Sequence, residues 1–244
     1  MATPSAPRFV LFGPAHLTVL FLTFALPMFL AWLVRRPGGD RLAKPIAWTF
    51  AAVLLLDQIV MTIWGMGPGM NLKDNLPLHL CDWATFTCVA ALIWRHRLSY
   101  ELTYFWGLAG TLQAVITPDL EVGFPDPGFF AFHIAHAGLI AAVLFLTLGL
   151  AMRPYPRSLV RAFLWLQLYA VVTAILNLLL DTNYGYLRRK PALPSLLDYL
   201  GPWPVYLVSL EALALTLFLL CYLPFAVADW MRRRGGGVGI SAAC

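Results

Sequence analysis

Long apolar runs, each about the length that crosses a membrane, constrain the fold of this chain more than any other feature. The runs cover residues 10–34, 45–64, 76–94, 99–117, 129–150, 158–180 and 203–229. About 20 apolar residues in a helix span the hydrocarbon core of a bilayer, and a helix satisfies its own backbone hydrogen bonds there. The sequence therefore predicts an all-α polytopic membrane protein, with seven transmembrane helices in a single domain over residues 1–244.

The composition excludes an ordinary soluble domain. Hydrophobic residues make up 60% of the chain and charged residues 12%, whereas a soluble domain has about 25% charged residues. The net charge of +5 comes from bases at the ends of the apolar runs, so it does not indicate nucleic-acid binding. We expect a multi-pass protein of the cell membrane whose partners are membrane lipids and not nucleic acid.

The distribution of Lys and Arg predicts the orientation in the membrane. If the N-terminus is outside, the cytoplasmic segments carry twelve of the 17 basic residues and the outer segments carry five. Because cytoplasmic loops are enriched in bases, we expect the N-terminus outside and the C-terminus in the cytoplasm. The loop 117–128, with three acids and no base, is then outside. The outer segment 181–202 departs from the rule, because it contains Arg-Arg-Lys at 188–190.

Polar side chains interrupt the apolar runs, and this orientation gives them a common depth. At about 1.5 Å per residue, most lie roughly 6–12 Å from the outer ends of their runs. The inner half of the membrane is expected to contain almost none. Ionisable groups inside a bilayer are costly and mark functional sites. The outer layer comprises Asp57, Gln58, His79, Asp82, Gln113, His133, His136, Asn177 and Glu211, with Asn75 at the surface.

Helical spacing brings some of these side chains onto one face. One face of the run 76–94 is predicted to present Asn75, His79, Asp82 and Phe86. His133 and His136 are three residues apart on the run 129–150 and face the same side. Cys81 lies about 160° from His79 on an ideal helix, so these two side chains do not face one pocket. Pro77 is expected in the first turn, where proline is tolerated.

Several segments together resemble a known family. NLPLHLCD, YFWGLAGTLQAVITPDL, FFAFHIAHAGLI, NLLLDTNYGYLRRKP and SLLDYLGPWPVYLVSLE look like the bacterial YwaF-type integral membrane family, over residues 70–225 or so. More distantly, the chain is similar to the eukaryotic transmembrane protein 164, described as a phospholipid acyltransferase with a Cys–His pair. The resemblance implies a base at His136. It also aligns the motif Pro-Cys-His with residues 77–79 and Gly-Pro-Trp with residues 201–203, so Leu78 occupies the nucleophile position.

Acyl transfer or hydrolysis of a lipid ester needs a base near neutral pKa and a nucleophile. Imidazole titrates near neutrality, so His136 is the candidate base, and either Asp82 or Glu211 would orient it. The nucleophile is either Cys81 or a water molecule held by His79. We expect the catalytic residues to be His136, His79, Asp82 and Cys81, and the substrate-binding residues to be Asn75, Gln113, His133, Asn177, Glu211 and Trp203.

Three alternatives remain open from the sequence. No cofactor is expected, and the first alternative is a metal-assisted mechanism. It would use zinc, whose nitrogen and oxygen ligands could come from His79, Asp82, His133 and His136. The same cluster of ionisable groups is also typical of a transporter or sensor of a small solute or proton. The third alternative is a non-catalytic structural membrane protein.

Overall fold

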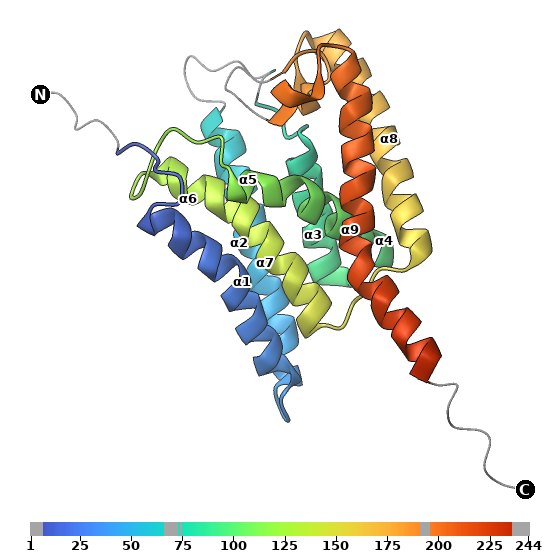
Figure 1. Ribbon diagram of the computed structural model, residues 1–244. Coiled ribbons are helices and arrows are strands. Elements are labelled where there is room, and N and C mark those ends of the chain that lie inside the picture. Colours follow the sequence, from blue (N-terminus) through green and yellow to red (C-terminus); the bar gives the residue numbers. More distant parts are fainter. Residues whose placement is uncertain (1–6, 66–72, 74, 191–195, 236–244) are drawn as a thin grey trace, which may run out of the picture.

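The computed structural model describes residues 7–65, 73, 75–190 and 196–235, and these residues form a bundle of helices (Figure 1). The long elements are α1 (Pro14–Arg35), α2 (Ala43–Gly65), α3 (Leu80–Trp94), α4 (Arg97–Trp106), α5 (Leu112–Ile116), α6 (Pro127–His133), α7 (Leu139–Leu144), α8 (Pro156–Leu180) and α9 (Val205–Gly235). Within the described ranges, the β-structure is limited to a single isolated bridge between Arg8 and Val122. The all-α prediction is confirmed.

Two of the predicted runs are helices that contain π-helical segments, in which hydrogen bonds reach one residue further than in an α-helix. The segment η3 (Gly107–Thr111) joins α4 to α5, and η4 (Ile134–Gly138) joins α6 to α7. A third segment, η5 (Phe145–Gly149), ends the latter helix. Short 3₁₀ turns complete the fold at η1 (Asp40–Leu42), η6 (Tyr184–Tyr186) and η7 (Leu196–Leu200). π-Helical turns are rare in proteins, but many of those that occur lie at functional sites. The residues beside η3 and η4 are therefore candidates for a functional site.

Five helical stretches are long and apolar enough to cross a membrane. They are 14–35, 40–64, 127–149, 156–180 and 205–234. The predicted run 76–94 is a shorter apolar helix of 15 residues, Leu80–Trp94. The predicted run 99–117 corresponds to α4, η3 and α5, which begin with Arg97 and contain Glu101. The helical positions of all predicted runs are thus reproduced within a few residues, and five of them meet the length and composition of a membrane span.

The stretch 127–149 is the central rod of the bundle. In its most apolar window 61% of the residues are buried, against 6–22% in the other four long stretches. It packs against α1, α2, α3 and α4, around a core that includes Leu54, Phe105 and Phe145. The outer helices instead present large apolar side chains to the exterior, such as Leu178 and Val208, each 74% exposed. An apolar exterior is the expected surface of a protein whose solvent is lipid.

The start of α3 differs from the prediction for a local reason. The helix begins at Leu80 and not at residue 76, and His79 is its N-cap, with extended backbone angles. Asn75 and Pro77 therefore precede the helix, and the predicted helical stripe from Asn75 to Phe86 is wrong at its first member. Proline restricts the residue before it to extended conformations, so the helix cannot run through Leu76 and Pro77. The chain instead bends at residues 75–77 and becomes helical only after His79.

Polar groups gather at both ends of the bundle, which corrects the expectation of a single polar layer. Glu101 on α4 is fully buried, and its Oε1 accepts from Arg97 Nε at 3.0 Å. The same oxygen accepts from Ser158 Oγ at 2.7 Å and from Arg161 Nη2 at 2.5 Å, both on α8. Glu101 lies within the predicted run 99–117 but was not among the polar residues expected to matter. It is instead a buried acceptor that joins α4 to α8 at the end opposite His79.

Candidate functional site

The N-terminus of α3 is fixed by a polar cluster around Asp82. The backbone N–H of His79 donates to Asp82 Oδ2 at 2.8 Å, and Gln58 Nε2 on α2 donates to Asp82 Oδ1 at 3.1 Å. An acidic side chain that accepts from the N-cap amide is half of a capping box. Two predicted site residues, His79 and Asp82, therefore lie together, and Gln58 connects them to α2.

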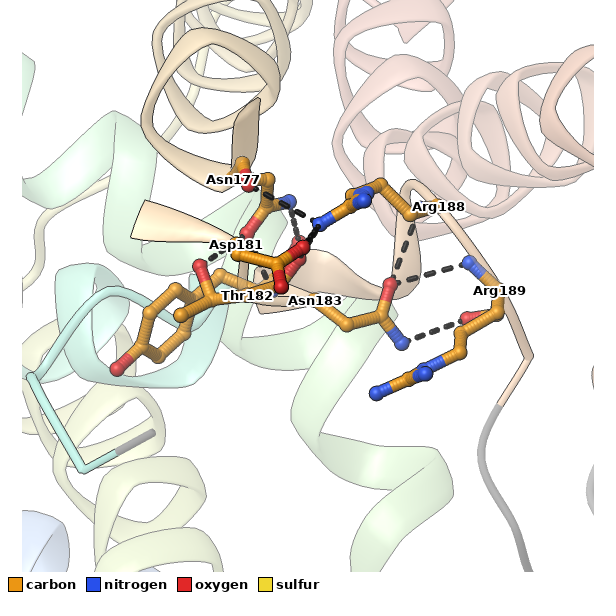
Figure 2. A network of polar contacts seen from close by, with 7 residues as sticks. Asn177, Asp181, Thr182, Asn183, Arg188 and Arg189 are labelled. Carbon is orange, nitrogen blue, oxygen red and sulfur yellow. Dashed lines mark hydrogen bonds and ion pairs between the residues drawn. The ribbon is translucent and has the colours of Figure 1, made fainter. Parts of the chain in front are cut away.

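A second polar network holds together the segment after α8 (Figure 2), and this segment contacts His79 through Tyr184. Asn177 is fully buried, and its Oδ1 accepts from Thr182 Oγ1 at 2.9 Å and from the Tyr184 N–H at 2.7 Å. Its Nδ2 donates to the Tyr184 carbonyl at 2.8 Å. Asn177 was predicted to bind substrate, but its side chain is committed to the backbone of the loop. It is a positioning residue for Tyr184.

Arg188 closes the network from the other side (Figure 2). Its Nη1 donates to the carbonyls of Asn177 and Thr182 and, at 2.8 Å, to Asp181 Oδ1. This interaction holds the pKa of the Asp181 carboxyl below its usual range. Asn183 Oδ1 accepts from the N–H groups of Arg188 and Arg189. Part of the Arg-Arg-Lys sequence that departed from the positive-inside rule thus has a structural role in this loop.

The loop places two tyrosine rings on His79. The ring centroid of Tyr184 lies 5.0 Å from that of His79 in an edge-on arrangement, and that of Tyr186 lies at 5.9 Å. Tyr184 also accepts at its hydroxyl from the N–H of Leu76, at 2.8 Å, and donates to the carbonyl of Lys73. The segment before α3 and the loop after α8, far apart in sequence, therefore form one wall around His79.

Cys81 shares Tyr186 with His79, but its other neighbours differ. The hydroxyl of Thr111, in η3, lies beside the thiol, and Tyr169 and Tyr186 are also close to it. Tyr169 on α8 donates its hydroxyl to the carbonyl of Leu78 at 3.0 Å. The thiol therefore lies between α3, η3 and α8, close to His79 in sequence but among hydroxyl groups.

Two histidines of the central rod have fixed ring orientations. Nδ1 of His136, in η4, lies 2.8 Å from the carbonyl of Phe132, and Nδ1 of His133 lies 2.7 Å from that of Phe129. A carbonyl only accepts, so each Nδ1 donates, and the neutral ring has its lone pair on Nε2. Among the described side chains, Nε2 of His133 is fully buried and has no hydrogen-bond partner. Nε2 of His136 does not share this combination of full burial and a missing partner.

The structure does not join all the predicted residues by direct contacts. Within residues 7–65 and 75–190, no hydrogen bond or ring contact connects His136 with His79, so a water-mediated link stays a prediction. Glu211 on α9 accepts from Gln167 on α8 at 2.6 Å. Gln113 is exposed and bonds Thr117 on its own helix, and Trp203, 60% exposed, donates to the carbonyl of Leu187. Asn75 is half-buried, in the segment before α3.

The sequence did not indicate that tyrosines belong to this cluster. Tyr169 lies in an apolar run, where an aromatic side chain is expected to pack against other helices. Tyr184 and Tyr186 flank Gly185, whose positive φ of 64° turns the loop so that both rings reach His79. Gly between two aromatic residues at the end of an apolar run is the signal that predicts such a turn. In the described part of the chain, no group of three or more His, Cys, Asp or Glu side chains is arranged to bind a metal ion.

Helices of membrane length with apolar outer faces and polar clusters inside the bundle define a multi-pass membrane protein. The model of the TMEM164 family matches residues 11–222. The chain therefore belongs to the TMEM164 family. It is also similar to an uncharacterized protein of Treponema pallidum (strain Nichols), with 32% identity over 229 residues that cover 89% of this chain and 90% of the relative. No solved structure matches the chain.

Proposed function

We propose that this membrane protein cleaves or transfers the acyl group of a membrane-lipid ester, with His136 as the general base. One observation supports this assignment above others. The Nδ1–H of His136 donates to the Phe132 carbonyl at 2.8 Å, which fixes the ring and leaves the lone pair of the neutral imidazole on Nε2. A base needs a lone pair of fixed direction that a substrate can reach. The location of His136 in a π-helical segment also supports a functional role.

The proposed reaction uses a hydroxyl group as the nucleophile. Nε2 of His136 removes the proton from water, or from the hydroxyl of an acceptor lipid, as its oxygen attacks the ester carbonyl. The ester C–O bond then breaks, and the departing alkoxide takes the proton back from the imidazolium. With water the products are a fatty acid and an alcohol. With an acceptor hydroxyl the products are a new ester and an alcohol.

The clusters around His79 and Cys81 have supporting roles in this proposal. The rings of Tyr184 and Tyr186 pack against His79 beside apolar helices, and such a mixed polar and aromatic surface suits the boundary between a lipid headgroup and its chains. We also propose the finer topology predicted from the sequence: seven membrane crossings in the cell membrane, an outer N-terminus and a cytoplasmic C-terminus. A place in the bacterial YwaF-type branch of the family belongs to the same proposal.

The proposal is tested with the full-length protein in proteoliposomes that contain fluorescent phospholipid esters. His136→Gln keeps a polar side chain but removes the base, and should lower release or transfer of the fluorescent acyl chain by roughly 10²–10⁴-fold. His96→Gln is the matched control, because His96 is an exposed histidine before α4. Equal turnover by both variants rejects His136 as the base. A folded wild-type protein that turns over no ester in a panel of membrane lipids rejects the enzymatic function.

A further inference from the structure

A large apolar cavity lies along the central rod, and neither His79 nor the rings of Tyr184 and Tyr186 line it. Its volume is about 1150 Å³, and its walls come from α1, α2 and the stretch from Phe129 to Ala141. Three lining residues, Leu22, Leu26 and Val53, are also 43–49% exposed, so the cavity opens sideways to the apolar exterior of the bundle. His136 is not part of its wall, so the cavity is separate from the proposed catalytic base.

The polar side chains of the cavity wall divide into satisfied and unsatisfied groups. The hydroxyls of Thr18, Thr23 and Thr49 donate to carbonyls four residues earlier on their own helices. His16 accepts the N–H of Phe12 at Nδ1, and its Nε2 lies 2.8 Å from the Val115 carbonyl, to which it donates. None of these four side chains needs a ligand.

His133 is the exception among the buried polar side chains of this wall. Its ring is 5% exposed, its Nδ1–H is used by the Phe129 carbonyl, and its Nε2 is buried without a partner. A buried polar atom left unpaired is destabilising, so native proteins pair such atoms with protein, water or ligand. Because Nδ1 donates, Nε2 can only accept while the ring is neutral. The missing partner must therefore bring a hydrogen-bond donor.

We infer that this cavity binds a single-chain amphiphile with a neutral hydroxyl head, such as a long-chain alcohol, whose O–H donates to His133 Nε2. The apolar walls accommodate the chain, and the lateral opening lets it enter from the bilayer. A charged head would lose its hydration among these walls at high cost. Among the described residues that line the wall, Arg8 alone is a Lys or Arg, and it is exposed. The ring of Phe9, whose centroid lies 6.3 Å from that of His133, moves aside when the hydroxyl reaches the nitrogen.

The inference is tested with the full-length protein in phosphatidylcholine nanodiscs and a photoreactive long-chain alcohol. We expect the probe to label peptides of α1, α2 and the 127–149 rod. Unlabelled hexadecanol should compete about five- to tenfold better than its methyl ether, because one hydrogen bond is at stake. His133→Leu should remove this preference while labelling persists. His136→Leu, three residues further along the same rod, should retain the preference.

Equal competition by the alcohol and the methyl ether in the wild-type protein would mean that only bulk lipid tails enter, and this overturns the inference. Labelling outside the three walls overturns it as well. If His133→Leu fails to fold, Val53→Trp tests whether the probe binds in this cavity. The substitution introduces an indole into the cavity from a half-exposed position, so it should abolish labelling. The readout is binding, so an inactive protein that still prefers the alcohol would separate this inference from the enzymatic proposal.

Discussion

The backbone N–H of His79 donates a 2.8 Å hydrogen bond to the carboxylate of Asp82, three residues further along the chain. The other oxygen of this carboxylate accepts from Gln58 on α2. Each carboxylate oxygen of Asp82 therefore has a donor from a neighbouring segment. The residue stabilises the start of α3 against α2, and the predicted role of orienting the His136 imidazole has no support in its contacts.

Replacing Asp82 should affect stability more than chemistry. Asp82→Ala removes the acceptor of the N-cap amide and of Gln58, and we expect a loss of about 1–2 kcal/mol in thermal unfolding of the detergent-solubilised protein. Asp82→Asn keeps one oxygen acceptor and should lose less. If Asp82→Asn instead abolished lipid turnover at an unchanged melting temperature, the carboxylate would have a chemical role.

Cys81→Ser distinguishes the two predicted nucleophiles. The described neighbours of the thiol are Thr111, Tyr169, Tyr186 and Asp82, with no hydrogen bond to an imidazole. We expect lipid turnover to remain within a few-fold of wild type, since water or an acceptor hydroxyl attacks the ester. A loss of roughly 10²-fold or more with an intact fold would identify Cys81 as a covalent nucleophile, because serine is far weaker at neutral pH.

Asn177→Leu should loosen the loop that carries Tyr184. The substitution leaves the buried Tyr184 N–H and carbonyl without the partners that the Asn177 amide provides. We expect a loss of about 2 kcal/mol or more in unfolding, together with faster hydrogen exchange in residues 182–190. Gln113→Leu is the control, because this exposed amide bonds only within its own helix, and its loss should lie within about 0.5 kcal/mol of zero.

The ion pair between Asp181 and Arg188 predicts an acid-sensitive loop. Arg188 lowers the folded-state pKa of Asp181 below the unfolded value of about 3.9. The pair therefore stabilises the loop above about pH 4, and this contribution disappears as the pH falls through the lowered pKa. Asp181→Asn should speed hydrogen exchange at residues 182–188 near neutral pH but make little difference at about pH 2. An equal effect of the substitution at both pH values would contradict the assignment.

The orientation is tested by labelling single cysteines in a background without the four native ones. Gly123 is unsuitable, because a Cβ there would lie 2.6 Å from the Arg8 carbonyl oxygen. Asp119 is exposed in the same loop, and Asp119→Cys should react with a membrane-impermeant maleimide in intact cells. Arg157 is exposed in the first turn of α8 on the predicted cytoplasmic side, and Arg157→Cys should react only after lysis. The reverse pattern would invert the orientation.

The positions of the helices followed from the sequence because burial in lipid demands long apolar helices whatever their partners. The exact start of α3 did not follow from the sequence. The apolar run includes Pro77, but the helical backbone does not extend back to that residue. The length of α3, 15 residues, likewise reflects a helix whose first turn is replaced by a cap. Pattern alone does not separate these cases.

The site was located in part by its polar residues. His79 and Asp82 adjoin each other as expected, but helical spacing says nothing of which helices are neighbours. Glu211 therefore proved to bond Gln167, and Asn177 to hold a loop backbone. The π-helical segments could not be predicted from the sequence pattern, because the pattern was interpreted with the 100° per residue of a regular α-helix. They alter the angular relation between residues on either side, as between Trp106 and Gln113 across η3.

Each π-helical segment adds one residue relative to a continuous α-helix. In the central rod this extra residue lies within Ile134–Gly138. Deleting one residue there would return the segment to a continuous α-helix and leave the turns on either side nearly in register, whereas the same deletion in a continuous α-helix would turn one side by about 100° relative to the other. His136 lies inside the segment, so the direction of its ring would change, while His133 and the residues beyond Leu139 would keep their packing. The inserted residue therefore sets the direction of His136 independently of His133, the histidine that lines the large cavity.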